Sequence, residues 1–199
     1  GEYEKIFPKA KLYDDNFSID LIGLENQIKT TNLVVIVNPN NPTGTVLYTD
    51  EIYSLAKKHA SVFFLVDESF IEFSDEKSII LLLKERGLDN VIVIKSLSKN
   101  LGVPGLRLGY VFSTNKSLLD YISDRIPIWN SNSIAEFYLE IILKHKNDLL
   151  HSYNKTKEDR AIFAENLNNI SFIETVFSLI PCVPPSFIKG VILSIKDCI

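Results

Sequence analysis

Lys99 is the residue in this sequence with the most suggestive setting for covalent chemistry. It follows the apolar run 91–94 in the string Ser96-Leu97-Ser98-Lys99, and Arg107 comes eight positions later. A lysine amine can attack a carbonyl carbon, hold the product covalently and then carry protons. An arginine guanidinium binds phosphate through paired hydrogen bonds. Because an isolated lysine or arginine is usually just a solvated surface residue, the order and spacing of these groups carry the interpretation.

Two other polar segments follow apolar runs earlier in the sequence. Asp67 ends the run 62–66, and the block Asn38-Pro39-Asn40-Asn41-Pro42-Thr43-Gly44 follows the run 33–37. An unpaired carboxylate buried at a strand end is costly, so we expect Asp67 to have a cationic partner. A helix cap or a structural ion pair is the alternative for Asp67, and a rigid loop is the alternative for the asparagine block.

The apolar runs alternate with helical patterns, which predicts an α/β fold with a largely parallel sheet and flanking helices. The side chains that end neighbouring strands would then converge on one crevice. The predicted elements are a helix capped by Thr49 or Asp50 with Ile52, Leu55, Ala56 and His59 on one face, a helix over 78–86 ended by Gly87, a strand over 108–112, a helix over 134–142, and a polar helix over 145–167.

The chain has 199 residues, of which 46% are hydrophobic, so it can form a sizeable core. After residue 170 the pattern changes to short strand candidates at 172–176 and 191–195, separated by prolines. We therefore expect residues 1–145 to form a large domain, and residues 146–199 to form a bridging helix and the start of a small α/β domain. The interrupted second domain predicts a fragment of a longer protein.

Composition argues against several classes of function. The formal net charge is −4 and basic residues are scattered, which disfavours a nucleic-acid partner. No signal peptide and no apolar run long enough for a membrane span is visible, so we expect a cytoplasmic protein without a membrane partner. Cys182 and Cys198 have no metal-ligand spacing, and neither do His145 and His151, so no metal is expected.

Taken together, these segments resemble the fold-type I, pyridoxal-phosphate-dependent aminotransferases, in the branch of histidinol-phosphate aminotransferase and threonine-phosphate decarboxylase. The string that ends in Lys99 and the following 104–110 segment, Pro-Gly-Leu-Arg-Leu-Gly-Tyr, match the family's lysine–arginine segment. The resemblance covers about residues 1–170. It implies pyridoxal 5'-phosphate as cofactor, the large domain of that fold without its N-terminal part, and a homodimer when the protein is full length.

The resemblance also implies roles for the residues of the cofactor site. Lys99 would hold the cofactor and move protons, and Asp67 would keep the pyridine nitrogen protonated. Asn41 would donate to the phenolic oxygen, next to a cis Asn41-Pro42 bond. Arg107 would bind the phosphate together with the hydroxyls of two serines, Ser96 and Ser98.

Three further positions bear on the substrate and the reaction. Phe70 stands where many aminotransferases have a tyrosine that contacts the phenolic oxygen, and phenylalanine at this place is familiar from the threonine-phosphate decarboxylases. Asn130 and Asn132 resemble an asparagine pair that lines the substrate pocket, although either one could instead cap the next helix.

The sequence therefore predicts an aminotransferase that moves an amino group between an amino acid, possibly phosphorylated, and a 2-oxo acid. Lys99 and Asp67 are the predicted catalytic residues. One alternative is a pyridoxal-phosphate-dependent decarboxylase of a phosphorylated amino acid, which Phe70 favours. The other is an inactive fragment of such an enzyme, because this sequence lacks the glycine turn and the C-terminal arginine that the family uses.

Overall fold

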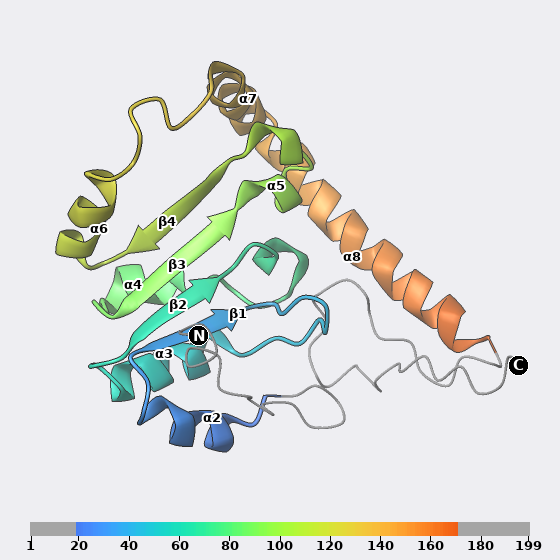
Figure 1. Cartoon of the computed structure of the whole chain (residues 1–199). Helices are drawn as coiled ribbons and strands as arrows, with labels where there is room; N and C mark the ends of the chain where they lie inside the picture. The colour runs from blue at the N-terminus through green and yellow to red at the C-terminus, as the bar shows by residue number, and fades with distance from the viewer. Residues whose placement is uncertain (1–18, 171–199) are drawn as a thin grey trace, which may run out of the picture.

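A mixed, mostly parallel sheet forms the centre of the chain (Figure 1). The computed structural model describes residues 19–170. The sheet has the order β1-β2-β3-β4; β1, β2 and β3 run parallel, and β4 is antiparallel to β3. The strands are β1 Leu33–Val37, β2 Phe63–Asp67, β3 Val91–Ser96 and β4 Gly109–Ser113. This arrangement agrees with the prediction from alternating apolar runs and helices.

The helices match the predicted ones in four places. These are α3 Thr49–Lys58, α4 Ile80–Arg86, α7 Ser133–Lys144 and α8 Lys146–Asn168. The sequence patterns did not predict α2 Leu21–Ile28 or α6 Lys116–Ser123. Single helical turns form at α5 Leu97–Asn100, η1 Ile71–Phe73 and η2 Pro104–Leu106.

Two details of the helix ends test the sequence reasoning. Tyr48 occupies the N-cap position of α3, so the cap prediction of Thr49 or Asp50 was wrong by one or two residues. Gly87 ends α4 with φ at 69°, a left-handed conformation that glycine adopts readily, as predicted. The division predicted at residue 145 falls between α7 and α8 and stays a prediction. The strand candidates after residue 170 lie outside the described residues.

One face of the sheet packs against helices to form the core. Alternate strand residues such as Ile36, Phe64 and Val93 are buried against Ile52 of α3 and Leu83 of α4. The neighbouring strand positions project to the other face, where Leu33, Val35 and Phe63 are more than two-fifths exposed. No helix among the described residues is long and apolar enough to cross a membrane.

Candidate cofactor site

The carboxyl ends of the three parallel strands place polar residues along one edge of the sheet. Asp67 ends β2 and is the register partner of Val37, the last residue of β1, which Asn38 follows. Ser96 ends β3, one strand further along. The asparagine block, Asp67 and the segment that carries Lys99 therefore begin at the same edge, as the sequence predicts.

The antiparallel direction of β4 adds the arginine segment to this edge. Ser96 pairs with Gly109, the first residue of β4, so Arg107 lies two residues before the same sheet edge. Gly109 approaches β3 so closely that a Cβ atom there would lie 2.8 Å from the carbonyl oxygen of Lys95. A side chain at position 109 would therefore push β4 away from β3, which gives the motif glycine a structural reason.

Asp67 is held by a serine and not by a cation. Its Oδ1 accepts hydrogen bonds from the Ser69 amide at 2.9 Å and from the Ser69 hydroxyl at 2.6 Å. The same hydroxyl accepts a hydrogen bond from the Ser96 amide at 2.9 Å, which joins the ends of β2 and β3. Asp67 is half-buried, and within residues 19–170 it has no ion pair. Its predicted cationic partner is thus not a side chain of the described region.

Lys99 lies in the single turn α5 that follows β3. The Ser96 hydroxyl caps this turn by accepting a hydrogen bond from the Ser98 amide at 3.3 Å, and the Ser98 side chain is buried. The Leu97 amide donates to the carbonyl of Leu108 at 3.0 Å, which ties the turn to the arginine segment. Lys99 itself is exposed, and no residue of the described region forms an ion pair or hydrogen bond with its amine.

Arg107 adopts a left-handed backbone conformation with φ at 55° and ψ at 42°. Its Nη1 donates to the carbonyl of Pro104 at 3.2 Å, and the side chain is exposed. Among the residues that the structure describes, no carboxylate pairs with this guanidinium. Most of its donors therefore face solvent, as binding of an anionic group requires.

The asparagine block forms a loop that is closed by a buried side chain. The buried Asn38 side chain donates to the Leu47 carbonyl at 3.0 Å and accepts from the Leu47 amide at 2.8 Å, so it closes the loop. Asn41 is exposed, and the expected cis Asn41-Pro42 bond is present. A second cis bond, between Asn38 and Pro39, was not anticipated. The rigid-loop interpretation fits Asn38, while the cofactor contact predicted for Asn41 stays a prediction.

The two candidate substrate residues have different settings. Asn132 caps α7 by accepting a hydrogen bond from the Ala135 amide at 2.9 Å, and its side-chain amide donates to the Leu106 carbonyl at 3.2 Å. The helix-cap alternative thus describes Asn132. Asn130 is exposed and lines a hollow of about 450 Å³ together with Tyr110 of β4 and side chains of α6. Phe70 occupies the position just before η1.

Sequence reasoning missed a buried ion pair next to the candidate site. Lys95 of β3 is 7% exposed and pairs with Glu72 of η1. A signal was present, because residue 95 continues the alternation of Val91 and Val93, which are both buried. A lysine on the buried face of a strand requires an acidic partner.

Glu68 is a second buried acid on the same segment. Its carboxylate accepts hydrogen bonds from the Ser78 hydroxyl and from the Ile79 amide at 2.8 Å, which anchors the start of α4. Burial raises the pKa of the Glu68 carboxyl, against the opposing effects of these two hydrogen bonds and of nearby Lys95.

This raised pKa predicts how stability changes with pH. Between the ordinary pKa of 4.5 and the raised folded value, the native state binds more protons than the unfolded state. The contribution of Glu68 to the free energy of unfolding is therefore full below pH 4.5 and decreases as pH rises through the folded pKa. Glu68→Gln should remove this part of the pH dependence, as measured by urea unfolding across a pH series, with exposed Glu85→Gln as control. If the free energy of unfolding changed with pH in Glu68→Gln as it does in the parent, the raised pKa of Glu68 would be contradicted.

The chemistry of these groups fits the predicted cofactor. The amine of Lys99 and the guanidinium of Arg107 lie at this edge, and neither has an acidic partner among residues 19–170. The hydroxyl of Ser96 lies there too, with the carboxylate of Asp67, of which one oxygen is bound by Ser69. An aldehyde, a phosphate and a protonated ring nitrogen are the complementary groups, and pyridoxal phosphate carries all three.

Comparison with known proteins supports this interpretation. The profile of the family described as "Aminotransferase class I and II" matches residues 6–185. A histidinol-phosphate aminotransferase from Ruminiclostridium cellulolyticum is 30% identical over 83% of this chain and 46% of its own length. An L-serine phosphate decarboxylase from Sulfurospirillum multivorans is 32% identical over 76% of this chain and 39% of its own length.

Solved structures show the same fold. The histidinol-phosphate aminotransferase from Clostridium acetobutylicum superposes with a TM-score of 0.75 at 30% identity, over 83% of this chain and 50% of that one. A decarboxylase from Sulfurospirillum multivorans gives a TM-score of 0.71 at 29% identity, over 83% and 49%. The chain thus spans half or less of the length of these relatives. These matches confirm the predicted fold class and the predicted cofactor class, and the chain belongs to the aminotransferase class I and II family.

Proposed function

We propose that this chain supplies the cofactor-binding edge of a pyridoxal-phosphate-dependent aminotransferase that acts on an amino acid and a 2-oxo acid. The observation that carries the proposal is the gathering, at one sheet edge, of the amine of Lys99, the carboxylate of Asp67 and the guanidinium of Arg107. The family match and the two histidinol-phosphate aminotransferase relatives support it.

Each residue has a role that its surroundings allow. The cofactor, when bound, supplies an electron sink for bonds at the substrate α-carbon. Lys99 would hold it covalently and would move a proton with its amine, while Asp67 would keep a proton on the ring nitrogen. Arg107 would neutralise the charge of the phosphate, the Ser96 hydroxyl would donate a hydrogen bond to it, and Asn41 would donate to the phenolic oxygen. Asn132 contributes by fixing the start of α7 beside the loop of Leu106.

A decarboxylase of a phosphorylated amino acid is the second candidate. Phe70, which lacks the hydroxyl of a tyrosine, favours it, and so does the resemblance to the serine phosphate decarboxylase and to the solved decarboxylase. The two reactions differ in which bond to the substrate α-carbon is broken, and the substrate groups that orient that bond decide the outcome.

The remaining expectations belong to the same proposal. We propose that the active protein is a cytoplasmic homodimer, with a large domain up to residue 145 and a smaller one after it. Since the chain spans half or less of its relatives, we further propose that residues 1–199 made alone bind the cofactor weakly.

Separate measurement of the two products tests the proposed reaction. We expect the protein that contains this chain to convert pyridoxal phosphate to pyridoxamine phosphate when an amino acid is added without a 2-oxo acid. Carbon dioxide release should stay at the level of Lys99→Ala, the matched inactive control. Release of carbon dioxide from a phosphorylated amino acid, without pyridoxamine phosphate, would instead establish the decarboxylase.

A further inference from the structure

The turn that carries Lys99 is a single helical turn closed at its C-terminal end by backbone hydrogen bonds. The Leu101 amide donates to the Leu97 carbonyl at 3.1 Å, and the Gly102 amide donates to the Lys99 carbonyl at 3.3 Å. A helix of one turn is marginal in isolation, because nucleation costs more than one or two hydrogen bonds return. Contacts from other elements must therefore decide where this turn sits.

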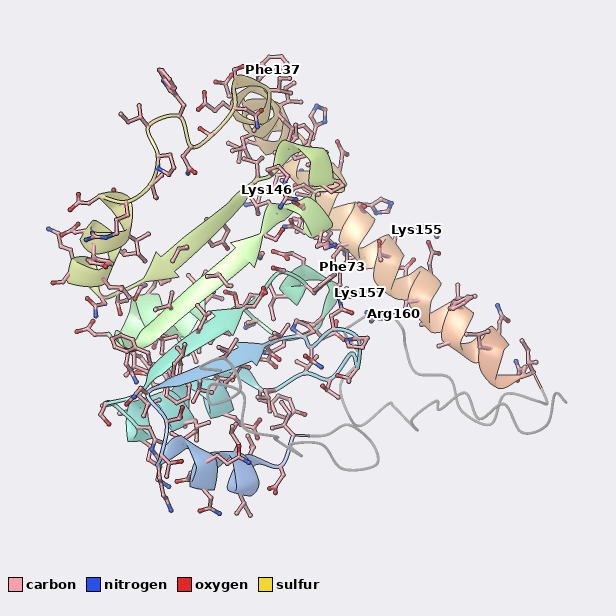
Figure 2. The ribbon with its side chains drawn as sticks, viewed as in Figure 1. Phe73, Phe137, Lys146, Lys155, Lys157 and Arg160 are labelled. Atoms are coloured by element: carbon pink, nitrogen blue, oxygen red, sulfur yellow. The ribbon has the colours of Figure 1, made fainter. Side chains whose placement is uncertain are left out.

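The longest described helix, α8, lies across the sheet edge and is fastened there (Figure 1). Figure 2 shows Arg160 and Lys157 on α8 beside the segment that carries Phe73. Arg160 donates to the Phe73 carbonyl at 2.9 Å, and Lys157 pairs with Asp75 at 3.1 Å. The ring of Tyr153 packs edge-on against Phe73, with centroids 5.6 Å apart. These contacts make α8 a fixed support for whatever its side chains touch.

Helix α7 contacts α8 and carries Tyr138 to the residues directly after Lys99. The Tyr138 hydroxyl donates to the carbonyl of Leu101, the C-cap residue of the turn, at 3.2 Å. This hydrogen bond joins the C-terminal end of the turn to the pair of helices α7 and α8.

We propose that Tyr138 is a positioning residue that holds the Leu101 end of the turn and so fixes the Lys99 amine at the sheet edge. The role of Lys99 rests on the function proposed above, whereas the contacts of the turn do not. Tyr138 lies 37 positions further along the chain than Leu101, so a contact from α7 helps to set the position of the turn that carries Lys99.

Tyr138→Phe tests this, because the variant keeps the ring and removes only the hydroxyl. Without cofactor, amide hydrogen exchange at Leu101 and Gly102 should become about three- to tenfold faster in this variant, the effect of losing one hydrogen bond. Tyr121→Phe, which removes the hydroxyl of an exposed ring, is the control, and thermal unfolding curves should show that both variants are folded at the temperature of the experiment. Exchange within about twofold of the control would overturn the proposal.

Labelling of Lys99 by pyridoxal phosphate and borohydride is the second measurement. The cofactor concentration that gives half-maximal labelling should rise about threefold or more in Tyr138→Phe, while maximal labelling stays the same. Faster exchange with unchanged half-maximal labelling would overturn the positioning of Lys99. If Lys99 of the unsubstituted protein is never labelled, the proposed function fails, and the exchange result still decides whether Tyr138 holds the turn.

Discussion

Replacing Lys99 by alanine should abolish covalent attachment of pyridoxal phosphate and lower turnover by at least about 10²- to 10⁴-fold, the usual contribution of a general acid–base group. The amine is exposed at the sheet edge and has no acidic partner among residues 19–170, so nothing in that region competes for it. Borohydride reduction followed by peptide mass mapping measures the attachment, and product formation measures the turnover.

Lys95 provides an internal comparison, because this second lysine lies in β3, just before the turn that carries Lys99. It is buried and paired with Glu72, so it should stay unlabelled. Lys116→Ala, at the exposed start of α6, is the matched control and should label like the parent. Label found on Lys95, with Lys99 unmodified, would show that the site has been assigned to the wrong lysine.

The parts of the site that the sequence predicts are those that local pattern controls. An apolar run followed by a polar residue defines a strand end, and parallel strands bring their ends to one edge, which places Asp67 and Lys99. Gly109 is also predictable as a motif residue, although its reason, the close approach to Lys95, appears only in the structure.

The parts that the sequence leaves open depend on contacts between distant residues. The pairs Glu72 with Lys95 and Tyr138 with Leu101 form across 23 and 37 positions. The strand alternation marks position 95 as buried, but no local pattern identifies Glu72 as its partner or Tyr138 as the partner of Leu101. Asn132 shows a different limit, because asparagine is common both at helix caps and in binding pockets. Only the bond from the Ala135 amide to its side chain reveals the cap.

Asp67→Ala is expected to lower turnover by at least about a hundredfold, the scale of losing one preorganised electrostatic group, while some cofactor still binds through Lys99 and Arg107. The carboxylate favours the protonated ring nitrogen, and without that charge the electron sink is weakened. Steady-state kinetics and the visible absorption of bound cofactor measure the two effects separately.

Asp67→Asn separates this charge from the structural role of the same side chain. An amide oxygen at this position can still accept the hydrogen bonds from the amide and hydroxyl of Ser69, so the junction between β2 and β3 should survive. We therefore expect Asp67→Asn to unfold like the parent in urea but to lose turnover as severely as Asp67→Ala, with exposed Asp124→Ala as the control. If Asp67→Asn kept turnover within a few-fold of the parent, Asp67 would be only the residue that ties Ser69 to the end of β3, and the ring nitrogen would need another partner.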